Sequence, residues 1–251
     1  MSRFFLTLDQ ASNQLYQRLI AEAEISLISQ PGPKRLKDIQ KSLPSVNSLN
    51  TQTNQQINWP VDFDKINTHL PDQDEALCAL LEPLSTELIE SGATQVLIPN
   101  ITLSLVFKRL GLLYAQLIDP VSLLQKHLIE LSPSNTQLEH KFTVYGGKYT
   151  ACSDVWSQAT EQGTWTFYPN AQHISERVDQ IRRTTFVKAS TESGWLKSAA
   201  VELAGLMGQD KLSLSVLACS ELSQIFQQHQ NCFSGLKVID LAELQAAAFI
   251  R

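Results

Sequence analysis

The chain has 251 residues, of which 43% are hydrophobic and 18% charged, and its formal net charge is −5. This composition is typical of a globular protein, and the length suffices for one large α/β domain or two small ones. The acidic balance and the lack of a basic cluster argue against nucleic acid as a partner. No apolar run is long enough to cross a bilayer, and the N-terminus turns polar too early for a secretory signal. We therefore expect a cytoplasmic protein without a membrane partner.

The elements expected in the first half are strands at residues 4–8, 93–99 and 114–118 and helices at 13–28, 73–91, 105–110 and 121–131. Gly92 is placed to end a helix, and Pro99 ends the strand that follows it. Residues 100–104 are expected to form a loop. Residues 29–60 are rich in Pro, Ser, Asn and Gln, which predicts a polar insertion, with a short strand near 57–63.

The elements expected in the second half are strands at residues 141–145, 165–168, 212–217 and 238–239 and helices at 153–161, 169–181, 191–207 and 241–250, with one more helix beginning near Leu222. Residues 73–104 and 191–222 share one order: helix, glycine, strand, polar loop. Alternating strands and helices predict parallel sheets. The predicted fold class is therefore α/β, with two similar parallel-sheet units facing each other across a cleft.

The boundaries expected for these units follow from the repeat. The N-terminal unit comprises residues 1–115 and 225–251, with the terminal helix packed back on it. The C-terminal unit comprises residues 116–224.

One strand delivers a thiol to the cleft. The apolar run 214–218 ends in Cys219-Ser220-Glu221, at the start of a helix. Ligands bind at the carboxyl ends of strands in α/β folds, and a helix N-terminus stabilises anions and can lower the pKa of a thiol. Ser220 could cap this helix, and Glu221 would complement its dipole. The alternative is that Cys219 is a small buried apolar side chain.

The other cysteines, Cys78, Cys152 and Cys232, form no CxxC pair with Cys219 or with one another. This spacing predicts neither a disulfide framework nor a zinc site, and the histidines show no metal-ligand spacing. We expect Cys78 in the core and Cys232 in a polar loop. We expect no metal.

Four stretches resemble the aspartate/glutamate racemase superfamily, and together they cover about residues 70–225: SGATQVLIPNIT at 91–102, GGKYTACSD at 146–154, FYPNAQHISERVDQI at 167–181 and LSLSVLACSEL at 212–222. The resemblance implies a cofactor-independent enzyme in which two cysteines face the substrate α-carbon from opposite sides. Cys219 stands at the position of the second cysteine. Asn100 stands where the first is expected, and its amide has no usable basicity near neutral pH.

The resemblance also implies a binding site. Thr102 aligns with a threonine that contacts the substrate carboxylate, Ser220 with its counterpart in the second half, and Thr150 with the threonine of the middle turn. Helix capping is an alternative role for Thr102 and Ser220. Residues 7–10 stand where a glycine-rich substrate loop is expected. The implied partners are a small carboxylic or amino acid and a second copy of the chain in a homodimer.

Three functions follow. The first is racemisation or isomerisation by Cys219 with an unidentified second group, for which Cys152 is a candidate. The second is one-base chemistry, as in the similar arylmalonate decarboxylases, which use a single cysteine in the second half as proton donor; Asn100 would then donate a hydrogen bond to an enediolate. The third is a binding protein that keeps a carboxylate pocket without turnover.

Overall fold

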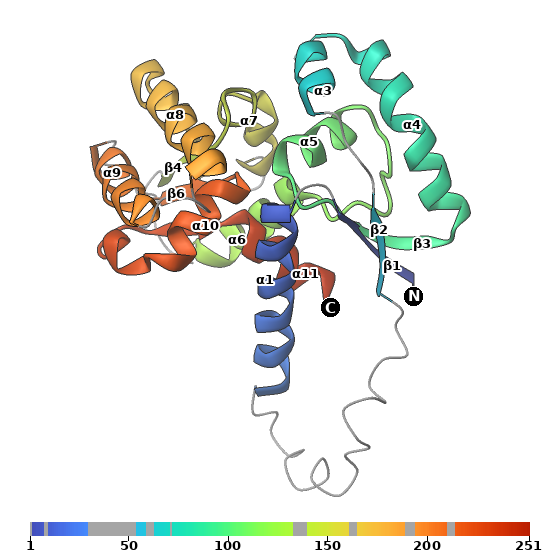
Figure 1. Ribbon diagram of the computed structural model, residues 1–251, viewed down its shortest axis with the longest axis horizontal. Helices are drawn as coiled ribbons and strands as arrows, with labels where there is room; N and C mark the ends of the chain where they lie inside the picture. Colours follow the sequence, from blue (N-terminus) through green and yellow to red (C-terminus); the bar gives the residue numbers. More distant parts are fainter. Residues whose placement is uncertain are drawn as a thin grey trace, which may run out of the picture.

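The computed structural model describes residues 2–7, 10–29, 54–58, 63–70, 72–132, 140–160, 165–188, 194–209 and 214–251. They form two α/β units that lie side by side, each built on a parallel sheet (Figure 1). The predicted fold class of two parallel-sheet units is confirmed.

The first sheet has the strand order β2-β1-β3, with β1 at Ser2–Thr7, β2 at Asn54–Asn58 and β3 at Ala93–Leu97. The period of two divides its side chains between two cores. Phe4, Leu6 and Val96 pack into one cluster with α4 (Asp74–Glu90) and α5 (Ile101–Arg109). Phe5 and Leu97 pack on the other face, against α1 (Gln10–Ser29) and α11 (Leu241–Phe249). Helix α3 (Phe63–His69) lies beside α4.

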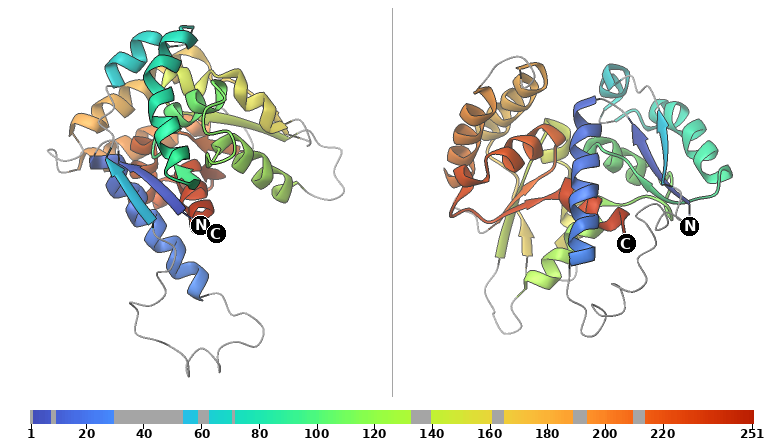
Figure 2. Two further views of the ribbon diagram at one scale, coloured as in Figure 1. Left: turned by 90° about the vertical axis from the view of Figure 1, so that its right-hand side faces the viewer. Right: turned by 60° about the horizontal axis from the view of Figure 1, so that its bottom comes forward.

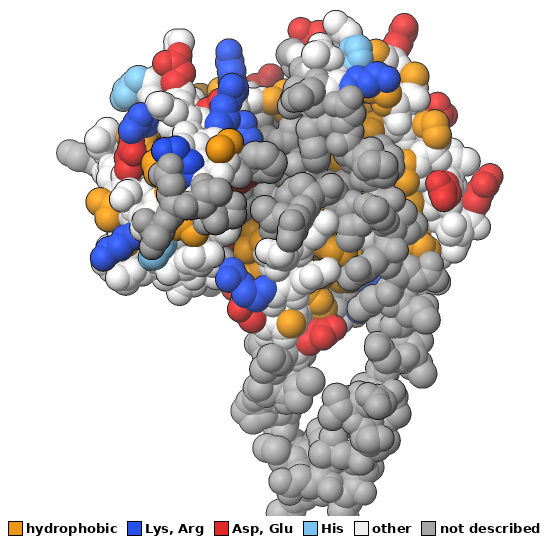
Figure 3. Space-filling view, in the orientation of Figure 1, with side chains coloured by type: hydrophobic (Ala, Val, Ile, Leu, Met, Phe, Trp, Pro, Cys, Tyr) orange, Lys and Arg blue, Asp and Glu red, His pale blue; other side chains and the backbone are white. Residues whose placement is uncertain are grey.

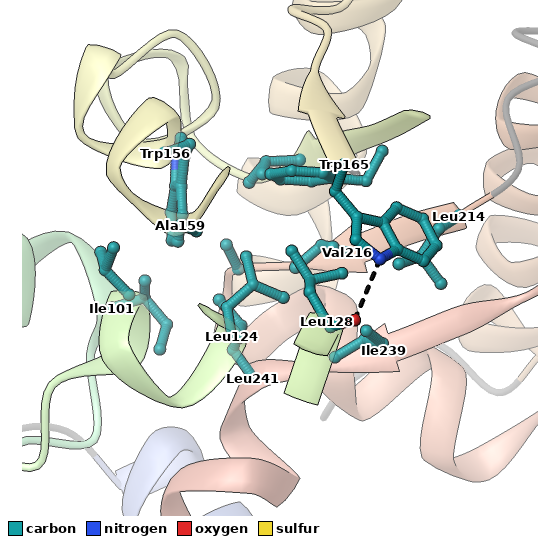
Figure 4. Close-up of a cluster of buried hydrophobic side chains, with 14 of the residues drawn as sticks. Ile101, Leu124, Leu128, Trp156, Ala159, Trp165, Leu214, Val216, Ile239 and Leu241 are labelled. Carbon is teal, nitrogen blue, oxygen red and sulfur yellow. Dashed lines mark hydrogen bonds between the residues drawn. The ribbon is translucent and has the colours of Figure 1, made fainter. Parts of the chain in front are cut away.

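The second sheet has the order β5-β4-β6-β7, with β4 at His140–Tyr145, β5 at Trp165–Phe167, β6 at Leu214–Leu217 and β7 at Val238–Asp240. One face packs against α6 (Pro120–Leu131) and the 3-10 helix η2 (Asp154–Thr160). Figure 4 shows this core, in which the indole N–H of Trp165 donates to the Leu128 carbonyl at 3.0 Å. The other face packs against α8 (Gln172–Lys188), α9 (Trp195–Gln209) and α10 (Ser220–Gln228).

Helix α1 stands between the two units, as the right-hand view of Figure 2 shows. It packs against α11 and α10, so it contacts the helix that begins beside Cys219. A buried hydrogen bond from the Tyr16 hydroxyl to Gln245 Oε1, at 2.6 Å, joins α1 to α11. The Gln245 amide in turn donates to the Ile118 carbonyl at 3.1 Å. The two termini of the chain therefore help to hold the units together.

The division into 1–115 with 225–251 and 116–224 remains a prediction. Strand β7 pairs with β6, which places residues 238–240 in the second sheet rather than with the first. Helix α11 contacts α1 and β3 of the first unit but also α6. The polar insertion 29–60 lies outside the described residues except for β2, which begins earlier than the strand expected near 57–63.

Three local predictions are wrong. Residues 100–104 are not a loop, because α5 begins at Ile101, directly after Asn100. Residues 114–118 form no strand: the chain turns there, with a positive φ of 53° at Leu113, Tyr114 is 91% exposed, and only a bridge from Leu117 to Val96 remains. The α9 helix continues through Gly208, to Gln209.

Candidate active site

A cleft of ≈ 2380 Å³ lies between the two units. Side chains from both units line it, among them Asn100, Thr102, Cys152, Arg182, Cys219 and Ser220. This space is larger than the roughly 300–1,000 Å³ of ordinary small-ligand pockets, so specific side chains rather than overall shape must select a ligand. Acidic and basic side chains are interspersed over the face of the molecule drawn in Figure 3.

Cys219 is the N-cap residue of α10, with extended backbone angles (φ −159°, ψ 135°). Strand β6 is buried along its whole length, which anchors the chain immediately before the thiol. Its side chain is half-buried, makes no capping hydrogen bond to the helix, and lines the cleft. The expected position of Cys219, at the carboxyl end of a strand, agrees with this geometry.

The Cys219 thiol donates a hydrogen bond to Glu221 Oε2 at 2.6 Å. The same oxygen accepts the Ser220 hydroxyl at 3.1 Å, and the Ser12 hydroxyl of α1 donates to Ser220 at 2.9 Å. The other oxygen, Glu221 Oε1, lies 3.7 Å from Nη1 of Arg182. Ser220 therefore does not cap its helix with its side chain but links Glu221 to α1.

Burial is the main reason that the pKa of the Cys219 thiol is raised well above its usual value of 9.0, and the Glu221 carboxylate raises it further. The guanidinium of Arg182 opposes this shift without cancelling it. The stabilisation of the thiolate expected from the helix N-terminus is therefore outweighed by burial of the thiol and by the Glu221 carboxylate 2.6 Å away, which both disfavour a negative charge on the sulfur. At neutral pH the sulfur therefore keeps its proton and is suited to donate it.

Asn100 forms the corresponding wall of the first unit. It is the N-cap residue of α5, and its Oδ1 accepts the N–H of Leu103 at 2.9 Å. Asn100 lines the cleft. Because its oxygen serves the helix, its amide nitrogen is the atom it can offer to a ligand.

Thr102 and Thr150 meet across the boundary between the units. Their hydroxyl oxygens are 2.5 Å apart, Thr102 on α5 and Thr150 on α7 (Lys148–Ala151). Thr150 is fully buried and is not part of the cleft lining, whereas Thr102 is half-buried and lines it. Neither side chain is used as a helix cap. The pair joins the two walls and leaves Thr102 as the one of the two within reach of a ligand.

The remaining cysteines occupy different settings. Cys152 follows α7 directly, is exposed and lines the cleft. It therefore stays a candidate for a second thiol of the site. Cys78 is half-buried on α4 rather than enclosed in the core. Cys232 lies in the 3-10 helix Gln230–Phe233 and packs against the core of the second unit, so the expected polar loop is wrong.

Sequence analysis missed three members of the site: Ser12, Asp179 and Arg182. Arg182 is held by Asp179, whose Oδ1 accepts from its Nε at 3.1 Å and its Nη2 at 3.0 Å. The i,i+3 spacing of Asp179 and Arg182 on a predicted helix was the available signal. Nothing in the sequence indicated that Asp179 or Arg182 lies near Glu221. The expected substrate loop at residues 7–10 lies outside the described side chains.

Within the described residues, no group of three or more His, Cys, Asp and Glu side chains could hold a metal ion. In the same part of the chain, no helix combines the length and apolar character that spanning a membrane requires.

No protein-family model and no curated protein matches the chain. Solved structures do. An Asp/Glu racemase candidate from Yersinia pestis aligns with a TM-score of 0.66 at 14% identity, covering 99% of this chain and 97% of its own. An aspartate racemase homologue from Pyrococcus horikoshii aligns with a TM-score of 0.61 at 13% identity, covering 100% and 98%.

Glutamate racemase from Francisella tularensis, solved with D-glutamate, aligns with a TM-score of 0.55 at 11% identity, covering 99% of this chain and 79% of its own. The three alignments run over nearly the whole of this chain. The protein has the two-unit α/β fold of the aspartate/glutamate racemases.

Proposed function

We propose that this protein moves a proton at the α-carbon of a small carboxylic or amino acid from one face, with Cys219 as the proton donor and without a cofactor. The observation that supports this most directly is the half-buried thiol that lines the cleft and carries its proton on a 2.6 Å hydrogen bond to Glu221. Because the raised pKa keeps the thiol protonated at neutral pH, it can donate a proton but cannot accept one, so the first event must generate a carbanion without its help.

Loss of carbon dioxide from a substituted malonate is a step of this kind. The bond between the α-carbon and one carboxylate breaks, CO2 leaves, and the electron pair remains on the other acid group as an enediolate. The Cys219 S–H bond then breaks while a C–H bond forms at the α-carbon. Water returns a proton to the thiolate. The amide nitrogen of Asn100 is available to donate a hydrogen bond to the enediolate.

Two-base racemisation is the weaker candidate. It requires an acid and a base on opposite faces of the α-carbon, and Asn100 stands where the first cysteine is expected. Asn100 has no basic nitrogen, and its oxygen accepts the Leu103 N–H. The expected homodimer and cytoplasmic location have no support beyond the resemblance and the composition, and they stay predictions.

The test is proton exchange in deuterium oxide. The protein is incubated with each enantiomer of aspartate and glutamate and with phenylmalonate, and products are followed by NMR and chiral chromatography. We expect decarboxylation of phenylmalonate that places one deuteron on the α-carbon, and its loss in Cys219→Ser. Deuteration with inversion would establish racemisation instead. No reaction, together with thermal stabilisation by a dicarboxylate, would indicate a binding protein.

A further inference from the structure

Delivery of the Cys219 proton creates an electrostatic problem at this site. The sulfur lies 2.6 Å from Glu221 Oε2. Once the proton has left, a thiolate and a carboxylate face each other at that distance in a half-buried cleft. Like charges this close disfavour ionisation strongly unless a cation compensates them.

The cation in position to do so is Arg182. Among the described residues, its guanidinium is the cationic group within ion-pair distance of Glu221, with Nη1 3.7 Å from Oε1. The two carboxylate oxygens thus have separate partners: Oε2 holds the thiol and Oε1 faces Arg182. The Arg182 side chain is 26% exposed and the Glu221 side chain 15%, so solvent screens this contact only in part.

Arg182 is itself held in place. Its Nε and Nη2 both donate to Asp179 Oδ1, which leaves Nη1 to face Glu221. Asp179 also pairs with Arg183 through its other oxygen at 2.7 Å, but the Arg183 side chain is 72% exposed and, among the described residues, forms no ion pair with Glu221. Both neighbouring arginines therefore pair with Asp179, but Arg182 is the less exposed of the two and the one that reaches the Glu221 carboxylate.

We infer that Arg182 is a positioning residue that offsets the charge of the Glu221–thiolate pair left when Cys219 delivers its proton. The inference rests on the proposed function for its role in turnover, but the geometry makes it testable without turnover. Arg182 contacts Glu221 rather than a reacting atom, so it acts through the charge balance of its neighbours.

The ionisable groups around the thiol support the expected direction of the effect, in which the Arg182 charge favours the thiolate. Glu221 on α10 raises the pKa of Cys219, and Arg182 lowers it. The Asp179 carboxylate, which accepts from Arg182, partly offsets the effect of the Arg182 charge on the thiol pKa. On the opposite side, Tyr16 of α1 is buried and its pKa is raised well above 10.0, chiefly by burial and then by Asp240, so it stays neutral at the pH values of interest. Removal of the Arg182 charge should therefore make the thiolate harder to form.

The experiment measures the thiol itself. Cys219 is alkylated with iodoacetamide over a range of pH, and the rate is followed on its own peptide by mass spectrometry so that Cys152 does not interfere. Arg182→Gln should slow alkylation at a fixed, mildly alkaline pH by about tenfold, because fewer molecules carry the thiolate. Glu221→Gln should speed it. Arg182→Lys should restore most of the parent rate.

Arg183→Gln is the matched control, and its alkylation profile should follow that of the parent. The inference is overturned if Arg182→Gln alkylates at the parent rate or faster, or if Arg183→Gln has the same effect. Should Arg182→Gln fail to fold, the Arg182→Lys and Glu221→Gln profiles carry the test. Absence of turnover with any acid would remove the proposed function but would leave the alkylation result, and the charge balance it reports, intact.

Discussion

The two walls of the cleft share one backbone design and carry different side chains at the N-cap position. In each, a strand leads to the N-cap residue of a helix, which has extended backbone angles: Asn100 with φ −152° and Cys219 with φ −159°. In each, a serine four residues later donates to the carbonyl of the cap residue at 3.0 Å, Ser104 in the first unit and Ser223 in the second. The backbone design is therefore repeated.

The side chains of the two cap residues are used differently. Asn100 Oδ1 accepts the Leu103 N–H, whereas the Cys219 thiol makes no bond to its helix and donates to Glu221 instead. In the first wall the side-chain oxygen of Asn100 stabilises the helix. In the second wall the thiol of Cys219 stays at the cleft. We therefore expect substitution of Cys219 to change the reaction rate and substitution of Asn100 to change the local stability.

The largest effect is expected on turnover. Cys219→Ser should reduce α-deuteration or decarboxylation by at least about 100-fold, because a serine hydroxyl is a much weaker acid than a thiol. The measurement is the initial rate in deuterium oxide. Cys152→Ser serves as the control and should keep the parent rate. An equal loss in Cys152→Ser would instead identify Cys152 as a second thiol of the reaction.

A smaller effect is expected where the walls touch. Thr150→Val keeps the shape of the side chain but removes the hydroxyl that lies 2.5 Å from Thr102. Because the Thr102 hydroxyl then loses its partner at a buried junction, the free energy of unfolding should fall by about 1–2 kcal/mol. Urea unfolding followed by circular dichroism measures this. Thr184→Val, which removes an exposed bond to the Gln180 carbonyl, should change stability by less than about 0.5 kcal/mol.

Substitutions of the two N-cap residues, Asn100 and Cys219, should change the free energy of unfolding in different ways. Asn100→Cys, which copies the second wall onto the first, should lower the free energy of unfolding by about 1 kcal/mol because the Leu103 N–H loses its acceptor. Asn100→Asp retains an acceptor and should stay close to the parent. Cys219→Ser, which adds a capping oxygen, should be at least as stable as the parent. Equal stability of Asn100→Cys and Asn100→Asp would contradict the structural role of Asn100.

The smallest effect is a pH dependence. Burial raises the pKa of Cys219 above 9.0 in the folded protein, so the unfolded chain releases this proton at lower pH than the folded one. The stability that depends on it is complete below the unfolded pKa and is lost as pH rises. Between about pH 8 and pH 9, the parent should lose about 0.5 kcal/mol more than Cys219→Ser. Parallel stability curves for the two proteins would count against a raised thiol pKa.

Much of this architecture could be predicted from sequence alone. The alternation of strands and helices, and the repeated order around Gly92 and before Cys219, predicted two parallel α/β units and a thiol at a strand end. Local patterns of this kind survive because hydrophobic periodicity decides which face of an element is buried. The start of α5 was missed because the cap depends on one hydrogen bond, from the Leu103 N–H to Asn100.

Tertiary structure decided the chemistry of the site. The sequence by itself determined that Cys219 follows a buried strand, that Glu221 lies two residues on, and that Asn100 follows the corresponding strand of the first unit. Only the packing of α8 and α1 against α10 brings Arg182 to Glu221 and Ser12 to Ser220, and burial is the main cause of the raised pKa of the Cys219 thiol. The reason is physical: burial and charge act through space, between residues that lie far apart along the chain.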